Sequence, residues 1–341
     1  MEIKELVDIK DYTTFRMGPS VRYFCAVKTT DELKEGFSFA KARNLPVFIL
    51  GSGSNIVMGQ QDVFEVVVLK MELPGFKVIE ENDSKVLIKI GAGENWDGVV
   101  KRAVEMNLWG IEAMSWIPGT AGATPIQNVG AYGREIADTL VCLEGYEIAT
   151  GKTLIFTNHE CKFSYRDSVF KNELKDKFVI TSITLELSKR PGQVPDYPGV
   201  KKYFEERGIA SPSLAEIRQA IIDIRNIKLP DPKEIASVGS FFKNPIVTAE
   251  HYEKLKEKHP NIVAFPLERG EYNIGAGWML ETLGLKGKQF GNLKFYENNA
   301  LVVVNRGVAT FKELQTLVAQ TKTKAKEAFE IGLEMEPMLF T

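Results

Sequence analysis

The chain has 341 residues, of which 44% are hydrophobic and 26% charged, a composition typical of soluble globular proteins and a length that suits two or three domains. Its 43 Lys and Arg residues nearly balance its 45 Asp and Glu residues without any basic block, which disfavours nucleic acid or an anionic membrane as partner. No signal peptide or apolar run long enough to span a bilayer is recognisable, so we expect a cytoplasmic protein without membrane insertion.

The cysteines and histidines are too scattered for a metal site or a disulfide framework. Cys25, Cys142 and Cys161 form no CxxC pair, and the three histidines show no ligand spacing. We therefore predict that the protein holds no metal and that its cysteines are buried or incidental thiols.

The first third alternates short strands, glycine turns and helices. Residues 21–27 alternate as a half-buried strand, and residues 47–50 form a fully apolar one. The latter leads directly into a glycine–serine loop, a recurrent way to bring backbone N–H groups against a phosphate. The candidate ligand residues of this loop are Gly51, Ser52, Gly53, Ser54 and Asn55.

A second glycine loop follows the strand predicted at residues 86–90 and precedes a helix predicted at residues 97–106. Its sequence, Gly-Ala-Gly-Glu-Asn-Trp, resembles a dinucleotide fingerprint. However, Trp96 stands where the third glycine should let helix and strand pack closely. A Rossmann fold is therefore disfavoured, and any cofactor must be held in another way.

Residues 117–133 are dominated by small residues, so their backbone can approach a ligand closely. A purely structural loop is the alternative, although such loops seldom need so many small residues in sequence. The candidate ligand residues are Pro118, Gly119, Gly122, Ala123, Thr124, Asn128, Gly130, Ala131 and Tyr132.

The middle of the chain contains two predicted strands, at residues 141–149 and 178–187, with Tyr165 and Arg166 between them. Residues 188–212 are rich in Pro, Gly and Lys and indicate either a linker or an ordered functional loop. Ser213 and Glu216 form a capping box for a helix that should continue to about residue 227.

Ser240 follows a glycine and precedes two phenylalanines in a segment with prolines at 230, 232 and 245. This segment should form neither a helix nor a strand interior, because prolines and glycine interrupt both. A turn is the simple interpretation, but a hydroxyl held there could also be aimed at a ligand, with Lys228 and Asn244 nearby.

A second α/β unit is predicted beyond Pro245. It should contain a helix capped by Thr248, a helix at residues 276–283 and a strand at residues 300–304. The last helix should begin at the capping box of Thr310 and Glu313 and end at Gly332.

The two cofactor-type loops, Tyr165-Arg166, the Ser240 segment and the C-terminal Leu-Glu-Met-Glu together resemble the UDP-N-acetylenolpyruvoylglucosamine reductase family, in order and over nearly the whole chain. The resemblance implies an α+β fold, with an FAD-binding fold of the vanillyl-alcohol-oxidase type in two subdomains, residues 1–70 and 71–227. A C-terminal α/β substrate-binding domain, residues 228–330, and a tail, residues 331–341, that returns to the active site would follow. Residues 188–212, with Tyr197, resemble the tyrosine loop of the family's longer form.

The resemblance also implies a reaction. Non-covalent FAD would lie in the two small-residue loops, and NADPH would reduce the enolpyruvyl ether of a UDP-sugar in peptidoglycan precursor synthesis, with hydride passing through the flavin N5 to the vinyl carbon. Ser240 would supply the proton, Arg166 would grip the substrate carboxylate, and a protonated Glu336 would assist, with Glu334 as the alternative. The implied substrate-binding residues are Tyr165, Tyr197, Lys228, Asn244, Lys286 and Asn299, the last replacing a family glutamine.

Two other classes of protein remain open. A flavin oxidase or dehydrogenase of the same fold would act on another substrate but would not need the Ser240 segment. A non-catalytic nucleotide-sugar or flavin-binding protein would not need Arg166, Ser240 and Glu336 together. We expect a monomer, and a yellow colour of the purified protein would be the first discriminating observation.

Overall fold

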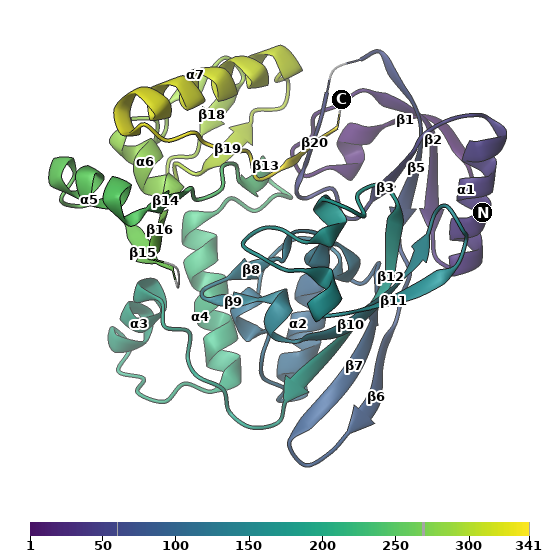
Figure 1. Cartoon of the computed structure of the whole chain (residues 1–341), viewed down its shortest axis with the longest axis horizontal. Helices are drawn as coiled ribbons and strands as arrows, with labels where there is room; N and C mark the ends of the chain where they lie inside the picture. The colour runs from purple at the N-terminus through teal and green to yellow at the C-terminus, as the bar shows by residue number, and fades with distance from the viewer. Residues whose placement is uncertain (60, 268–269, 341) are drawn as a thin grey trace. The chain divides into compact units, whose positions relative to one another are not determined.

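The computed structural model describes residues 1–59, 61–267 and 270–340, and the chain divides into two compact units (Figure 1). Unit 1 comprises residues 1–7, 21–52 and 63–226. Unit 2 comprises residues 8–20, 53–62 and 227–341. Two short N-terminal segments therefore belong to the same unit as the C-terminal third of the chain.

The first sheet of unit 1 has the strand order β1-β2-β5-β3. These strands are β1 (Lys4–Asp8), β2 (Ser20–Val27), β5 (Val63–Met71) and β3 (Val47–Leu50), and β3 runs parallel to β5. Helix α1 (Thr30–Ala42) begins at a capping box of Thr29 and Glu32. It buries Leu33 and Ala40 in one cluster with apolar side chains of β2 and β5, which fixes the helix on this sheet.

The second sheet of unit 1 is antiparallel throughout, in the order β11-β10-β12-β7-β6. Its strands are β11 (Thr153–Thr157), β10 (Leu140–Glu147), β12 (Phe178–Ser188), β7 (Lys85–Gly91) and β6 (Phe76–Glu81). Helix α2 (Trp96–Glu105) buries Trp96, Val99 and Val100 in a cluster with the apolar side chains of β7 and β12. Trp96 is fully buried in this core, where its indole N–H donates a 3.2 Å hydrogen bond to the Met114 carbonyl.

Short 3-10 helices and a small hairpin fill the remainder of unit 1. The hairpin consists of β8 (Gly130–Ala131) and β9 (Arg134–Glu135). The 3-10 helices within this unit are η2 (Glu112–Met114), η3 (Ala121–Gln127), η4 (Ile136–Asp138), η5 (His159–Cys161) and η6 (Val169–Lys171).

Residues 188–212 are ordered rather than an extended linker. They contain helix α3 (Pro198–Glu205), with Tyr197 at its N-cap and Pro198 at its first position. Val200 and Phe204 of α3 pack with Ile217 and other apolar side chains of α4 (Leu214–Lys228). The capping box predicted for α4 is confirmed, because the Glu216 carboxylate accepts a hydrogen bond from the Ser213 amide and the Ser213 hydroxyl accepts one from the Glu216 amide.

Unit 2 is built on a four-stranded sheet in the order β13-β19-β18-β17, with helix α7 (Phe311–Phe329) lying along it (Figure 1). The strands are β13 (Ala236–Ser240), β19 (Val302–Asn305), β18 (Leu293–Phe295) and β17 (Gln289–Phe290). Its core contains fully buried phenylalanines at 241, 242 and 295.

The other elements of unit 2 bring together distant parts of the sequence. A three-stranded sheet has the order β14-β16-β15, with β14 (Ile246–Thr248), β16 (Glu271–Ile274) and β15 (Ala264–Pro266). Strand β20 (Met338–Phe340) pairs in parallel with β4 (Ile56–Met58), and η1 (Ile9–Tyr12) lies in the first N-terminal segment of the unit. The remaining helices are α5 (Ala249–Lys258) and α6 (Ala276–Thr282).

Two sequence-based predictions are wrong in detail. Helix α7 ends at Phe329 rather than Gly332, because Glu330 takes a left-handed conformation with φ of +60° and Ile331 turns back into the core. The Ser240 segment was expected to avoid strand structure, yet residues 236–240 form β13. The strand tolerates Gly239 because its pairing with β19 shifts register between Ser237 and Ser240.

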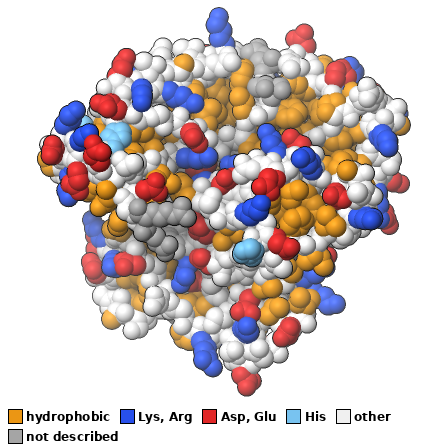
Figure 2. Space-filling model, in the orientation of Figure 1, with side chains coloured by type: hydrophobic (Ala, Val, Ile, Leu, Met, Phe, Trp, Pro, Cys, Tyr) orange, Lys and Arg blue, Asp and Glu red, His pale blue; other side chains and the backbone are white. Residues whose placement is uncertain are grey.

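The surface carries charges of both signs in close alternation on the face shown in Figure 2. This pattern follows from the near equality of acidic and basic residues in the sequence. Within the residues that the structure describes, we find no helix that is both long and apolar enough to cross a membrane.

Candidate active site

The two predicted cofactor loops lie against each other in unit 1. Gly51 directly follows β3 and lies close to the second loop. A Cβ atom built on Gly51 would lie 2.8 Å from the Thr120 Oγ1 and 3.7 Å from the Ala123 Cβ. Only glycine permits this approach without displacing Thr120. Thr120 and Ala123 lie 69 and 72 positions after Gly51 in the sequence, so the fold itself creates this contact.

The second loop also packs on the turn after β7. The Gly122 amide donates a 2.9 Å hydrogen bond to the Ala92 carbonyl, and a Cβ atom on Gly122 would lie 2.5 Å from the Ala92 Cβ. Sequence analysis missed Thr120 and Ala92 as members of this cradle. The available signal was the Gly-Ala-Gly sequence at 91–93, which does not form a Rossmann turn but allows close packing of backbone on backbone.

The small side chains of these loops form a donor set that suits FAD. Ser52 and Thr120 carry hydroxyl groups, glycines bring the backbone close, and the residues at Gly51, Ser52, Gly130 and Ala131 are half-buried. Hydroxyl and amide groups on such a surface are complementary to phosphate and ribityl oxygens. The cradle therefore fits the cofactor that the sequence predicted.

The predicted cofactor residues differ in the unit to which they belong and in the burial of their side chains. Gly53, Ser54 and Asn55 belong to unit 2, where Gly53 has φ of +66° and a Cβ atom on it would lie 2.1 Å from the Tyr12 carbonyl oxygen. Thr124 is buried and its hydroxyl donates to the Ala121 carbonyl. Gly119, the residue after Pro118, accepts a hydrogen bond from the Trp96 amide at its carbonyl. The Asn128 side chain is buried, with 1% of the residue exposed.

Tyr132 sits at the tip of the β8–β9 hairpin. Tyr132 and Gly133 have φ values of +52° and +80°, as a type I′ turn requires. The Tyr132 ring meets the Tyr197 ring edge to face, with centroids 5.1 Å apart. Burial raises the pKa of the Tyr132 phenol, and the neighbouring positive charge of Arg225 opposes this shift.

Arg225 is a residue that sequence analysis missed. It lies on α4, and its Nε donates a 3.1 Å hydrogen bond to the Trp116 carbonyl. The only signal for Arg225 in the sequence is its position three residues before Lys228, which is a predicted substrate-binding residue. Arg225 thus ties α4 to Trp116 and places its positive charge beside Tyr132.

Arg166 is held in a strained turn of unit 1. Its φ is +54°, a conformation that is unfavourable for a residue with a long side chain. The amides of Ser164 and Asp167 each donate to the other's carbonyl, at 3.2 and 3.1 Å, which closes the turn around Tyr165 and Arg166. The Arg166 guanidinium donates a 2.8 Å hydrogen bond to the Gly130 carbonyl and lies over the Tyr165 ring.

Ser240 ends strand β13 in unit 2, directly after a bulge. Gly239 has φ of +72°, and Ser240 pairs with Val302 of β19 after the register shift. Bulges of this kind re-aim the following side chain and are frequent beside active sites. The Ser240 side chain is half-buried, and the Phe241 amide anchors the next residue to the Leu301 carbonyl at 2.8 Å.

Glu336 lies beside the Ser240 segment. Its amide donates a 3.0 Å hydrogen bond to the Phe241 carbonyl, and Met335 pairs with Phe242 in an isolated bridge. The side chain of Glu334 is 75% exposed and forms an ion pair with Lys243 at 3.2 Å. The backbone of Glu336 is thus fixed beside Phe241, and the choice between the two carboxyl groups stays a prediction.

The predicted polar ligands of unit 2 fall into two groups. The Asn244 Oδ1 accepts a hydrogen bond from the Ala276 amide, and the Asn299 Oδ1 lies 4.0 Å from a Cβ atom built on Gly277, so both asparagines lie beside the first turn of α6. Lys286 lies on the loop after α6 in a half-exposed ion pair with Glu281, and Lys228 is the exposed last residue of α4. Arg166, Tyr165 and Tyr197 belong to unit 1, whereas Ser240 and Glu336 belong to unit 2.

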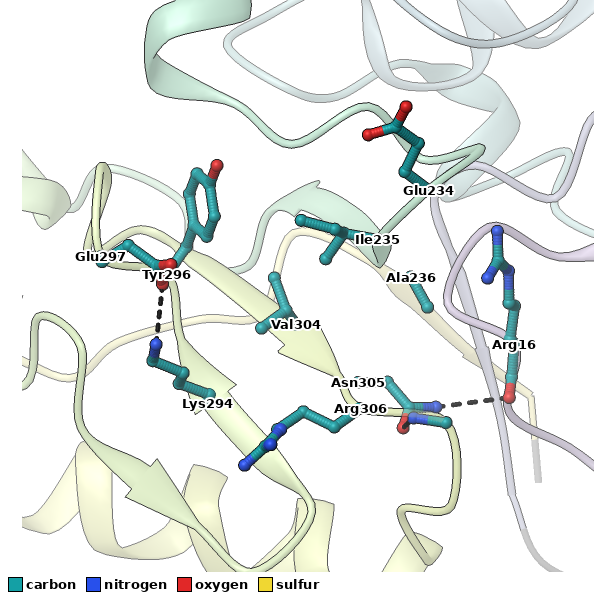
Figure 3. Close-up of a pocket in the computed structure, with 11 residues that line it drawn as sticks. Arg16, Glu234, Ile235, Ala236, Lys294, Tyr296, Glu297, Val304, Asn305 and Arg306 are labelled. Atoms are coloured by element: carbon teal, nitrogen blue, oxygen red, sulfur yellow. Dashed lines mark hydrogen bonds and ion pairs between the residues drawn. The ribbon is translucent and has the colours of Figure 1, made fainter.

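Unit 2 also has a pocket of about 410 Å³ that none of the predicted site residues lines (Figure 3). Its charged groups are largely engaged with the protein. Lys294 pairs with Glu297 at 2.9 Å, and the Arg16 guanidinium donates to the carbonyls of Pro232 and Lys233. The pocket is therefore not the site of the predicted chemistry.

Two protein-family models match the chain. The model described as "FAD binding domain" matches residues 21–157, and the model described as "UDP-N-acetylenolpyruvoylglucosamine reductase, C-terminal domain" matches residues 231–340. The first range contains both cofactor loops as far as Asn55 and Tyr132, and the second contains Ser240 and Glu336.

Curated relatives cover the whole chain. A UDP-N-acetylenolpyruvoylglucosamine reductase of Flavobacterium johnsoniae is 39% identical over 98% of this chain and 99% of its own length. The reductase of Bdellovibrio bacteriovorus is 39% identical over 99% of both chains, and that of Chromobacterium violaceum is 34% identical over 99% of both.

A solved structure agrees with the fold. The crystal structure of the UDP-N-acetylenolpyruvylglucosamine reductase from Thermus caldophilus matches with a TM-score of 0.69 and 24% identity, over 100% of this chain and 98% of that one. The predicted fold class, an α+β FAD-binding fold of the vanillyl-alcohol-oxidase type with a C-terminal domain, is confirmed. The subdomain boundaries and the individual site residues stay predictions.

Proposed function

Because the chain belongs to the UDP-N-acetylenolpyruvoylglucosamine reductase family, we propose that it reduces the enolpyruvyl ether of UDP-N-acetylglucosamine to the lactyl ether, UDP-N-acetylmuramate, at the expense of NADPH. The protein is an FAD-binding oxidoreductase, and its product is a precursor of peptidoglycan. We place it in the cytoplasm as a monomer with non-covalent FAD, since neither cofactor loop contains a histidine or cysteine that could be attached to the flavin.

The reaction adds two hydrogens across the vinyl double bond. FAD, when bound, supplies hydride transfer from NADPH to the terminal vinyl carbon. The electron pair of the double bond then accumulates on the carbon that bears the carboxylate, and this carbon must take a proton. The protein must stabilise that charge and deliver the proton.

Arg166 is the group proposed to bind the substrate carboxylate. A guanidinium can grip a carboxylate with two parallel hydrogen bonds and attract the charge that is delocalised into it. Its hydrogen bond to the Gly130 carbonyl uses one Nη and fixes the direction of the side chain. The strained backbone at Arg166 supports this role, because such strain concentrates at functional sites.

Ser240 is the proposed proton donor, and its position carries the proposal. Ser240 follows a bulge at the end of β13. The next residue, Phe241, is fixed by two backbone hydrogen bonds: its amide donates to the Leu301 carbonyl, and its carbonyl accepts from the Glu336 amide. A serine is a weak acid, but a fixed geometry and a strongly basic carbanion-like carbon favour the transfer. Ser240 gives up its hydroxyl proton to carbon and regains one from solvent.

The remaining polar residues are proposed to bind the UDP moiety. Tyr165, Tyr197, Lys228, Asn244, Lys286 and Asn299 offer hydroxyl, amide and ammonium groups for phosphate, sugar and base. The ordering of residues 188–212 on α4 supports a role for Tyr197 as part of a tyrosine loop rather than a linker. The predicted cofactor residues other than Asn128 are proposed to surround FAD, the glycines through their backbone groups.

The test is NADPH oxidation by the purified, FAD-loaded protein. We expect oxidation to depend on the enolpyruvyl substrate and the product, identified by mass spectrometry, to be the substrate plus two hydrogen atoms. Oxidation that depends on oxygen alone would instead indicate a flavin oxidase. A protein that remains colourless after incubation with FAD would contradict every flavoenzyme interpretation.

A further inference from the structure

Asn128 lies in the middle of the small-residue segment, but its side chain is turned into the protein. It is 1% exposed and has a left-handed backbone with φ of +46° at the end of η3. Its Nδ2 donates to the Glu135 Oε2 at 2.6 Å and to the Ser164 carbonyl at 3.1 Å. Its Oδ1 accepts the Ala137 amide hydrogen at 3.2 Å. An asparagine amide has two donor hydrogens, so both are already engaged by the protein.

These partners belong to the two structures that hold Arg166. Ser164 begins the closed turn that contains Arg166, and the same turn is tied by the Lys171 Nζ to the Arg166 carbonyl at 3.0 Å. Glu135 belongs to β9 and lies opposite Gly130 of β8, whose carbonyl accepts the hydrogen bond from the Arg166 guanidinium.

The contacts therefore form a closed ring. It runs from Asn128 to the Ser164 carbonyl, along the turn to Arg166, through the guanidinium to Gly130, across the hairpin to Glu135 and back to Asn128. Each step is a hydrogen bond or a strand pair, except that Ser164 and Arg166 are joined by the backbone of the turn. Within this ring, the Asn128 side chain donates to both parts, to the turn at Ser164 and to the hairpin at Glu135.

We propose that Asn128 is a positioning residue for Arg166 and not a ligand of the cofactor. By tying the Ser164 turn to the hairpin, its amide sets the direction of the Arg166 guanidinium toward the substrate carboxylate. The inference rests on the proposed function, since it assumes that Arg166 binds that carboxylate. Burial raises the pKa of the Glu135 carboxyl, while the hydrogen bond from Asn128 and the charge of Arg166 oppose the shift, so this carboxyl also responds to the same two partners.

The test compares two ligands that differ in the carboxylate. UDP-N-acetylmuramate carries it and UDP-N-acetylglucosamine does not, and binding of each to the FAD-loaded protein can be followed by the flavin absorbance. In Asn128→Asp, both donor hydrogens are lost and a second carboxylate faces Glu135. We expect the Kd of the carboxylate-bearing ligand to rise about tenfold, as for loss of one charge-assisted hydrogen bond, and the Kd of the other ligand to stay within about twofold. The FAD content and flavin spectrum should remain native.

Asn158→Asp is the matched control. The Asn158 Nδ2 also donates to two carbonyls, those of Ala137 at 2.7 Å and Leu140 at 2.9 Å, so it holds the neighbouring η4 segment but not the Arg166 turn. We expect a similar loss of thermal stability with an unchanged ratio of the two Kd values. An equal change of the ratio in both variants would mean that general destabilisation is the cause, and would overturn the proposal.

Asn128→Gly provides a second variant in case the aspartate does not fold. Glycine accepts the left-handed backbone and removes the amide without burying a charge. It should give the same selective loss of carboxylate binding. If either Asn128 variant instead loses FAD and keeps the native ratio of Kd values, Asn128 is a cofactor ligand. Failure of the native protein to reduce the enolpyruvyl substrate is a separate result, which would remove the proposed function rather than this contact.

Discussion

The amide of Glu336 donates a 3.0 Å hydrogen bond to the carbonyl of Phe241, the residue that follows Ser240. The catalytic serine and the C-terminal carboxyl group of the proposed mechanism are thus adjacent through the backbone, although 96 residues separate them in the sequence. Strand β20 stabilises this arrangement, because the Met338 amide donates to the Asn55 carbonyl at 3.0 Å. The C-terminal strand therefore fixes the position of Glu336 within unit 2.

Glu336 and Glu334 can be distinguished by parallel substitutions. Glu336→Gln is expected to lower turnover by about a hundredfold, since it removes the carboxyl group that is proposed to assist where charge develops. Glu334→Gln removes only the ion pair with Lys243 on an exposed side chain, so turnover should change less than about twofold. Steady-state NADPH oxidation measures both, and the reverse order of effects would assign the role to Glu334.

Arg166→Lys tests the two-point grip on the carboxylate. Lysine keeps the charge but loses the planar fork and the guanidinium hydrogen bond to Gly130. We expect turnover to fall by about tenfold or more, which corresponds to one charge-assisted hydrogen bond. Flavin content serves as the control and should stay native. A lysine variant with native turnover would give Arg166 a purely structural role.

The local signals of the sequence were sufficient for the helix starts. The hydroxyl groups of Ser213, Thr248 and Thr310 each accept a hydrogen bond from the backbone amide three residues later. Such caps can be predicted from the sequence because they depend only on residues within one turn. The end of α7 was less predictable. Glycine at 332 is the usual C-cap signal, but burial of Ile331 decides where the chain leaves the helix.

The features of the site that depend on contacts between distant parts of the sequence could not be predicted. The sequence indicated two cofactor loops, but their contact through Gly51 and Thr120 depends on the packing of unit 1. Likewise, the residue types at Ser240 and Glu336 were recognisable by their resemblance to a family, whereas the bulge at Gly239 depends on how β13 pairs with β19. Asn128 is predicted to bind the cofactor together with its small-residue segment, whereas the burial of its side chain could not be predicted, because composition does not reveal where one side chain points.

Asp97 and Arg218 form the pair that we expect to contribute most to the pH dependence of stability. Their side chains are 21% and 11% exposed, and the guanidinium donates two hydrogen bonds to the carboxylate. Burial alone favours the neutral acid, but the bonds from Arg218 and from the Trp116 amide hold the pKa of Asp97 below its ordinary value of 3.8. A depressed pKa stabilises the folded protein above the unfolded-state pKa and loses this effect as the pH falls through the folded-state pKa.

Asp97→Asn should therefore lower the free energy of unfolding by about 2 kcal/mol at pH 7, because it leaves the buried Arg218 without its carboxylate. The difference from the native protein should begin to shrink below about pH 4, where the carboxylate of the unfolded chain takes up a proton, and should vanish as the pH falls through the lower folded-state pKa. Thermal or urea unfolding at both pH values measures it. Glu65→Gln, which breaks the exposed pair with Arg22, is the control and should have a much smaller effect. A pH-independent loss in Asp97→Asn would contradict the electrostatic explanation.

The cysteines give a simple test of the core of unit 1. Burial raises the pKa of Cys25 to about 11 and that of Cys161 to about 12, so neither forms appreciable thiolate near neutral pH. Cys142 is half-buried on β10. A thiol reagent should label Cys142 first in the native protein and all three cysteines after unfolding. Cys142→Ser should remove the native reaction, and rapid labelling that persists in this variant would show that the core is open.

Ser240→Ala separates the two halves of the catalytic cycle. Reduction of the flavin by NADPH needs no proton from Ser240, so its rate should remain close to native. Reoxidation by the enolpyruvyl substrate needs a proton on the carbon beside the carboxylate, and we expect it to slow by at least the ~10²-fold typical of a lost general acid. Stopped-flow absorbance of the flavin reports each half. Ser237→Ala removes a hydroxyl from the same strand, three residues away on the buried side of the bulge, and should leave both halves native. If reduced Ser240→Ala is reoxidised by substrate at the native rate, the proton comes from another group, and the bulge at Gly239 has only a structural role.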